Sequence, residues 1–351
     1  MRAPRSLLAI IPVTLAILAG VPAGAQSVRN AGKYGAMFSW WYDALPPQTI
    51  DIPTIEWNAR TMAWWNGVVR QAVYARLGWI AAASWGEETT ADPAMLDPLL
   101  RAIDANGGGL KVALFDDTTS EVLRKNRDRH GAWALTPRFG LADLEGRGEG
   151  GLRYFYDQQW KRYFATIPDR YRLKINDRPV VFMWHGGFEW YANQSAFHSL
   201  LEALRAATRR DFGVDPFVIT EESWYRLDPS ARPDALYDWF DPARTNWTST
   251  NFAGMTVGNV IPGFNCPCDP PHPVVERQNG ELLRAVRESG HRGEETDIGT
   301  AERTGFVDER VLRVLRFRGN DHPVLPFEDR LDRYVLKLDL HTSSARCSTW
   351  N

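Results

Sequence analysis

The stretch KVALFDDTT, residues 111–119, is a short apolar run that ends in two aspartates and two threonines. An apolar run of this length that turns abruptly polar is typical of a buried strand with functional side chains at its C-terminal end. Four other runs have the same form: YGAMFSWWYD (34–43), LGWIAAASWGEE (77–88), RPVVFMWHGG (178–187) and PFVITEESW (216–224). Because the C-terminal ends of parallel barrel strands face one cleft, the five runs predict a shared polar site.

The segments between these runs have helical character. Apolar residues recur at helical intervals over 56–78, and we expect further helices over 92–105, 152–167, 194–210 and 276–288. Strand-like segments at ALYDWFDP (235–242) and MTVGNVIPGF (255–264) bring the number of strands to seven. The alternation predicts an α/β fold with a parallel sheet, specifically a (β/α)8 TIM-type barrel over residues 26–289 whose last repeat is missing from the pattern.

The last part of the chain, residues 290–351, does not continue this alternation of strands and helices. VLRVLRF and RYVLKLDL are strand-like, but neither follows a helix at the spacing of a barrel repeat, and charged residues interrupt the segment throughout. We therefore treat 290–351 as a divergent tail with no predicted fold.

The first 25 residues have the form of a secretory signal peptide. Arg2 and Arg5 precede an apolar stretch over 7–18, and small residues follow at 23–25. The apolar stretch is short for a membrane span, so we expect a mature chain that begins at Gln26 and is secreted or periplasmic, without a stable membrane anchor.

Composition narrows the class of protein. With 351 residues, 44% of them hydrophobic, the chain is long enough for one large domain, and we expect a monomer. With a net charge of -2, the chain lacks the excess of positive charge that would attract nucleic acid, so we expect no nucleic-acid partner. The 15 tryptophans favour a carbohydrate partner, because sugar rings stack on indoles. No metal or nucleotide motif is present, so no cofactor is expected, and spacing does not decide whether Cys266 or Cys268 bridges to Cys347.

Several stretches together resemble one family. GAMFSWWYD, KVALFDDTT, INDRPVVFMWHGG, FGVDPFVITEESW, YDWFDP and TVGNVIPGFN occur in this order between residues 34 and 287. At these residues the chain is similar to a bacterial family of secreted proteins catalogued as domain of unknown function 5010. The resemblance implies a glycoside-hydrolase-like (β/α)8 barrel without a settled substrate. It stops near residue 290, and a shift of reading frame there, which would leave an incomplete barrel, is one hypothesis for the loss.

Hydrolysis of a glycosidic bond requires one carboxylic acid and a second carboxylate. Strand alternation selects among the candidates. In the first run it places Val112 and Leu114 outward and Ala113, Phe115 and Asp117 inward. In the last it places Phe217 and Ile219 outward and Val218, Thr220 and Glu222 inward. Asp117 and Glu222 are therefore the predicted catalytic pair, with Asp116 and Glu221 as the next candidates.

Each candidate also has a structural interpretation. Paired acids at a strand end serve as helix caps, which suits Asp116 before Thr118, and Glu87 and Glu88 are typical of solvated loop acids. His185 is either a ligand for a sugar hydroxyl or a buried histidine. The remaining candidates for substrate binding are Trp40, Trp41, Tyr42, Trp85, Trp224, Asp238, Trp239 and Asp241; together with Trp184, about half of the aromatic ones are expected to be core.

Three functions remain open from the sequence. The first is a secreted glycoside hydrolase that acts on a poly- or oligosaccharide by carboxylate acid/base catalysis. The second is a catalytically inactive, carbohydrate-binding barrel. The third is a non-glycosidic hydrolase or lyase on the same fold, although no GxSxG motif supports an esterase.

Overall fold

The computed structural model describes residues 34–38, 40, 58–74, 77–87, 89, 91–122, 125, 139–148, 150–185, 191–239, 247–260 and 298–302. The predicted signal peptide, the helix expected over 276–288, the three cysteines and nearly all of the tail lie outside these residues.

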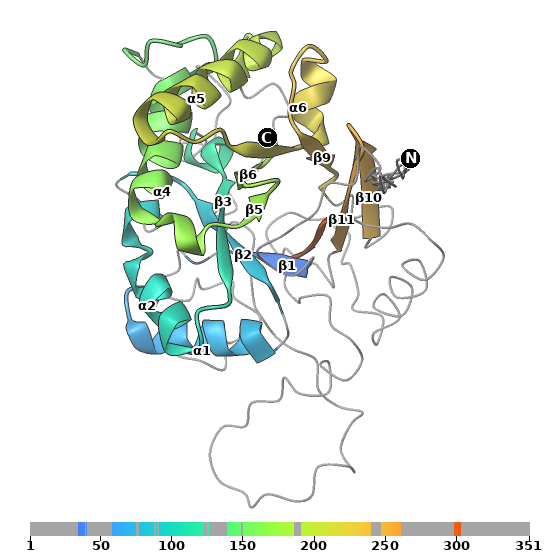
Figure 1. The fold of residues 1–351 in the computed structure, drawn as a ribbon. Helices are drawn as coiled ribbons and strands as arrows, with labels where there is room; N and C mark the ends of the chain where they lie inside the picture. The colour runs from blue at the N-terminus through green and yellow to red at the C-terminus, as the bar shows by residue number, and fades with distance from the viewer. Residues whose placement is uncertain are drawn as a thin grey trace, which may run out of the picture.

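A curled, ten-stranded sheet forms the centre of the molecule (Figure 1). Eight of its strands are parallel, in the spatial order β11 (Met255–Val260), β12 (Ile298–Glu302), β1 (Tyr34–Phe38), β2 (Trp79–Ser84), β3 (Lys111–Asp116), β6 (Arg178–Met183), β8 (Phe217–Glu221) and β9 (Ala235–Tyr237). Two strands are antiparallel, β10 (Trp247–Phe252) on β11 and β5 (Lys174–Ile175) on β6. A separate small pair joins β4 (Phe139–Gly140) to β7 (Tyr191–Ala192).

The two ends of this row of strands approach each other. The hydrogen-bonded path of described strands ends at β9 and β10, but the Asn259 side chain on β11 donates to the carbonyl oxygen of Asp238, just past β9, at 3.2 Å. The sheet is therefore strongly curled, and the expected α/β class with a parallel sheet is confirmed.

Helices cover the convex side of the sheet. They are α1 (Met62–Tyr74), α2 (Asp97–Ala105), the π-helix η2 (Arg153–Trp160), α4 (Lys161–Thr166), α5 (Phe197–Phe212) and α6 (Glu222–Leu227), with 3-10 turns η1 (Pro93–Met95), η3 (Asp169–Tyr171) and η4 (Gln194–Ala196). Figure 1 shows α1, α2, α4 and α5 along one side of the strands. Four of the expected helices are present, although the one predicted over 56–78 begins only at Met62.

The sequence pattern missed five of the described strands, namely the short β4, β5 and β7, the antiparallel β10, and β12. Of these, β12 matters most for the sheet: the strand-like segments noted in the tail lie elsewhere, yet β12 pairs with β11 on one side and with β1 on the other. Its sequence, IGTAE, has too few large apolar residues to stand out, because it is recognised only through its two neighbours.

The concave face is filled by aromatic side chains. Trp79 of β2 stacks on Phe182 of β6 at 5.4 Å, although β3 lies between the two strands. Side chains converge in this way only on the inner side of a curled sheet. Gly35 of β1 lies next to Trp79, and any Cβ at residue 35 would overlap the indole ring. The stack therefore marks the inner face and requires a glycine beside it.

Strand register then decides which side chains point inward. Phe115 is paired with Phe182, and Phe182 with Ile219, so these three share the inner face. The prediction for β3, with Phe115 inward, is confirmed.

For β8 the predicted alternation is wrong, because Phe217 and Ile219 are inward while Val218 and Thr220 face the helices. A strand that is buried on both faces, as β8 is, carries no polar and apolar alternation to distinguish the two sides.

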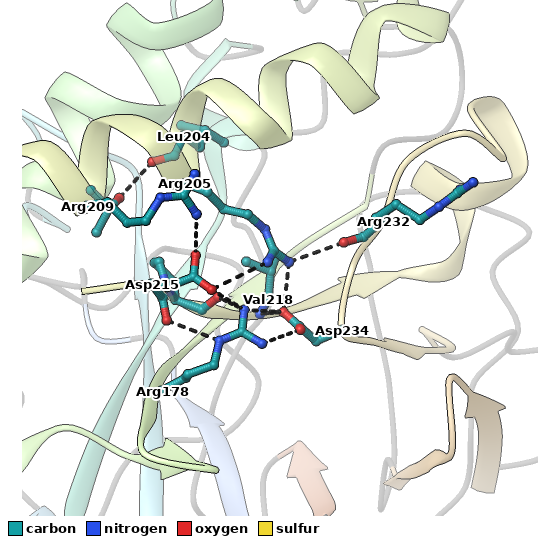
Figure 2. A network of polar contacts seen from close by, with 10 residues as sticks. Arg178, Leu204, Arg205, Arg209, Asp215, Val218, Arg232 and Asp234 are labelled. Atoms are coloured by element: carbon teal, nitrogen blue, oxygen red, sulfur yellow. Dashed lines mark hydrogen bonds and ion pairs between the residues drawn. The ribbon is translucent and has the colours of Figure 1, made fainter. Parts of the chain in front are cut away.

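Opposite the predicted site, a network of ion pairs joins the N-terminal ends of three strands (Figure 2). Asp234, just before β9, accepts hydrogen bonds from Arg178 of β6 at 2.5 and 3.0 Å and from Arg205 of α5 at 2.7 Å. It also accepts from the backbone N–H of Val218 at 2.8 Å, and Arg178 contacts Asp215 at 2.9 Å. Asp234 thus connects β6, β8 and α5.

We predict that Asp234→Ala lowers the free energy of unfolding by about 3 kcal/mol, because it leaves the buried Arg205 guanidinium and the Val218 N–H without this acceptor. The control is Arg209→Ala, which removes an exposed partner of Asp215 and should cost less than about 1 kcal/mol. Urea denaturation of both variants measures the difference. Equal losses would contradict the role assigned to Asp234.

Candidate functional site

The polar residues after β2, β3 and β6 lie side by side at the C-terminal end of the sheet. The backbone N–H of Asp117 donates to the carbonyl oxygen of Ser84 on β2 at 3.0 Å, and the N–H of Trp184 donates to the carbonyl oxygen of Asp116 at 2.9 Å. These bonds continue the strand pairing past the ends of the strands. The expectation that the runs deliver polar groups to one common edge is therefore met for β2, β3 and β6.

Asp117 is a buried carboxyl group, 6% exposed. Its Oδ2 accepts a hydrogen bond from the Trp85 indole at 2.7 Å, and its Oδ1 accepts from the backbone N–H of Ser120 at 3.2 Å, as an N-cap does. Burial raises the pKa of Asp117 to about 7, although the hydrogen bonds from Ser120 and Trp85 act in the opposite direction. A carboxyl group with this pKa can hold or release a proton near neutral pH.

Asp116 points to the other face of β3 and has a structural role. It accepts from the hydroxyl of Thr118 at 2.5 Å, from the N–H of Thr118 at 3.0 Å and from the indole of Trp160 at 2.7 Å. Burial raises the pKa of Asp116 to about 6 against these hydrogen bonds. Asp116 therefore closes the turn into the helical residues 118–122 and anchors the π-helix, in agreement with its structural interpretation.

At the end of β8, Glu221 and not Glu222 lies on the inner face, the reverse of what strand alternation predicted. Glu221 is paired with Tyr237 on the inner face and is 3% exposed. It caps α6 by accepting from the N–H of Ser223 at 3.0 Å and from the Ser223 hydroxyl. Burial raises the pKa of Glu221, while Ser223 and Arg226 lower it.

Glu222 is not an inward strand residue. It is the first residue of α6, its side chain is 28% exposed, and it forms an ion pair with Arg226 one turn later at 3.1 Å. The predicted inward orientation of Glu222 is wrong. It followed from placing Thr220 on the inner face, where the strand pairing places Ile219 instead.

Three partly buried tryptophans lie close to these acids. Trp239 stacks on Phe115 with ring centroids 6.0 Å apart and meets the edge of Trp184 at 5.8 Å. Trp85 donates to Asp117 as described above. These rings are the ones available for contact with a ligand.

Two other candidate tryptophans belong to the core. Trp40 is 1% exposed and donates to the Ala83 carbonyl at 2.6 Å. Trp224 is fully buried, donates to the Trp184 carbonyl at 2.6 Å and stacks on Phe197 at 4.4 Å. The expectation that some tryptophans near strand ends pack the core is confirmed for both.

The remaining candidates are more peripheral. The ring of His185 meets Trp184 at 5.2 Å, and burial, helped by Arg226, lowers the pKa of His185 to about 4, so the ring is neutral at neutral pH. Asp238 is half-buried, and Glu87 is exposed and pairs with Arg162 at 3.3 Å. Trp41, Tyr42, Glu88 and Asp241 lie outside the described residues.

The sequence did not single out the residues that hold the acids in place. Ser223 could have been predicted, because it comes two positions after Glu221, and a polar residue at that spacing from a strand-end acid is a recognisable capping signal. Trp160 gave no such signal, because it reaches Asp116 from 44 residues away. Within the described ranges, no three His, Cys, Asp or Glu side chains are grouped to hold a metal, and no helix is long and apolar enough to cross a membrane.

The raised pKa of Asp117 predicts a pH dependence of stability. Its ordinary value is 3.8, so the neutral acid stabilises the fold fully below about pH 4, and this contribution is lost as the pH rises through about 7. Asp117→Asn is neutral at every pH and should flatten this decline by on the order of 4 kcal/mol, since one pKa unit corresponds to about 1.4 kcal/mol. Denaturation across this pH range measures both slopes, and parallel profiles would refute the prediction.

Comparisons with known proteins place the fold. A solved structure described as "Glycoside hydrolase-like protein" has a TM-score of 0.52 and 11% identity over 81% of this chain and 86% of that chain. The GH99 endo-alpha-mannosidase from Bacteroides thetaiotaomicron has a TM-score of 0.45 and 14% identity over 76% and 82% of the two chains. At 11% identity the likeness to the glycoside hydrolase-like protein concerns the fold alone. The comparison with curated proteins finds no match. The family model described as Domain of unknown function (DUF5010) matches residues 18–300, and the chain belongs to that family.

Proposed function

We propose that this protein is a secreted glycoside hydrolase that acts on an oligo- or polysaccharide, built on a complete (β/α)8 barrel. Asp117 carries the proposal, because it is a buried acid with a pKa of about 7 that is bound to the partly buried Trp85 at the C-terminal ends of parallel strands. In barrel enzymes that end of the strands holds the active site. A raised pKa is what a general acid requires in order to protonate a leaving group near neutral pH.

Glu221 is the second carboxylate in this proposal. It lies on β8, with β6 alone between it and β3, so the backbones of Glu221 and Asp117 are about 10 Å apart. Side chains that converge from that spacing suit the carboxyl separations of glycoside hydrolases, which are roughly 5 to 10 Å. Asp117 protonates the glycosidic oxygen, and Glu221 acts on the sugar from the other side, as nucleophile or as base for water.

The aromatic cluster supplies the binding surface. Trp184 and Trp239 meet edge to face, and Trp239 rests on Phe115 within the inner face. A sugar ring that stacks on one indole would meet the edge of the other and lie next to Asp117. The neutral His185 ring beside Trp184 adds a group that can donate or accept a hydrogen bond from a hydroxyl.

A second candidate function is carbohydrate binding without catalysis. It is favoured by one observation: both Asp117 and Glu221 already serve as helix caps, through Ser120 and Ser223. Helix capping gives both carboxylates a structural role that requires no catalysis, and this role would support a sugar-binding surface equally well.

The catalytic proposal is tested with three variants of the mature chain. Asp117→Asn and Glu221→Gln should each lower the release of reducing ends from the best substrate in a polysaccharide panel by about 100-fold or more. Glu222→Gln is the matched control, since it changes the adjacent glutamate, which makes a surface ion pair, and should retain activity. Loss in Glu222→Gln with retention in Glu221→Gln would reverse the assignment. A folded wild type that releases nothing would favour the binding function.

Binding is tested separately. Trp239→Ala should weaken the affinity for a bound oligosaccharide about fivefold, because it removes one stacking face worth about 1 kcal/mol. Tyr74→Ala, at an exposed aromatic residue on α1, is the control and should bind like wild type. Isothermal titration calorimetry gives both affinities, and unchanged binding in Trp239→Ala would exclude this surface.

A further inference from the structure

A serine, a histidine and an aspartate form a hydrogen-bonded chain where α5 begins. Ser199 Oγ lies 2.9 Å from His198 Nε2, and His198 Nδ1 lies 2.8 Å from Asp228 Oδ2, just after α6. An ionised carboxylate only accepts hydrogen bonds, so Nδ1 carries the proton and Nε2 accepts from the serine hydroxyl. These are the hydrogen bonds of a nucleophile, a base and an orienting acid.

Asp228 is held firmly as an anion. Its side chain is 6% exposed, and besides the imidazole it accepts from the N–H of His198 at 2.8 Å and from the N–H and hydroxyl of Ser230 at 3.1 and 2.5 Å. Burial acts to raise the pKa of Asp228, but these hydrogen bonds outweigh it and the pKa is lowered. The carboxylate therefore holds the imidazole in a fixed orientation.

The other two members of the chain are accessible. The His198 side chain is 47% exposed and Ser199 is half-buried. Both lie in the first turn of α5, a helix of 16 residues, where the Asp228 carboxylate accepts from the backbone N–H of His198.

We propose that Ser199, His198 and Asp228 form a second hydrolytic site, which cleaves esters of short-chain acyl groups. Ser199 Oγ attacks the acyl carbon as its proton passes to His198 Nε2. The bond from the acyl carbon to the alcohol oxygen then breaks, and that oxygen takes the proton from Nε2.

Water completes the cycle. It attacks the acyl-serine and gives a proton to Nε2, and this proton returns to Ser199 Oγ as the carboxylic acid leaves. The absence of a GxSxG motif does not weigh against this site, because such triads are recognised by geometry and not by sequence position.

The test uses the full mature chain with p-nitrophenyl acetate and a fluorophosphonate label. We expect the label on Ser199 by peptide mass mapping, and a fall of about 100-fold in ester hydrolysis in Ser199→Ala. Ser195→Ala is the matched control. Ser195 is an exposed serine four residues earlier, and only its backbone carbonyl contacts His198, so this variant should hydrolyse the ester like wild type.

Three results would overturn the proposal: no label on Ser199, equal hydrolysis by wild type and Ser199→Ala, or an equal loss in both variants. Circular dichroism shows whether each variant is folded. The ester assay contains no glycan, so its result stands whether or not the protein cleaves polysaccharides.

Discussion

The stack of Trp79 on Phe182 is the constraint on which the rest of the sheet depends. The two rings bridge the concave side across β3, and the space for the indole exists only because residue 35 is a glycine. Aromatic rings of this size bury a large apolar area, and they do so here in a single register of β1, β2, β3 and β6. That register places Phe115 and Ile219 on the inner face. Asp117 and Glu221, each two residues further along the chain, lie on the same face.

Burial of carboxyl groups has two consequences at the C-terminal end of these strands. Asp116, Asp117 and Glu221 are each removed from water, and each is compensated by hydrogen bonds that also begin a helix or anchor one. The same groups therefore stabilise the fold and have raised pKa values. Asp117 differs from Asp116 in one respect that matters for chemistry: its indole partner is Trp85 on the inner side of the sheet, whereas the indole partner of Asp116 is Trp160 of the π-helix on the outer side.

Much of the architecture was accessible from the sequence. The five apolar runs, four of the helices and the parallel order of strands follow from local periodicity and from the polar stop at the end of each run. The inward direction of Phe115 and Asp117 was also correct. The strand β12 was not accessible, because its five residues carry no pattern of their own and depend on pairing with β1 and β11. The triad at Ser199 was equally hidden, since Asp228 reaches His198 across 30 residues.

The sequence by itself determined that acids and tryptophans would gather at one edge of a parallel α/β sheet, because strand ends and their polar residues are local features. Only the tertiary structure decided between Glu221 and Glu222, and showed that Trp224 is fully buried while Trp239 is partly exposed. β8 is buried on both faces, so its sequence is compatible with either orientation. The choice comes from the pairing of Ile219 with Phe182, a contact between strands that no local pattern contains.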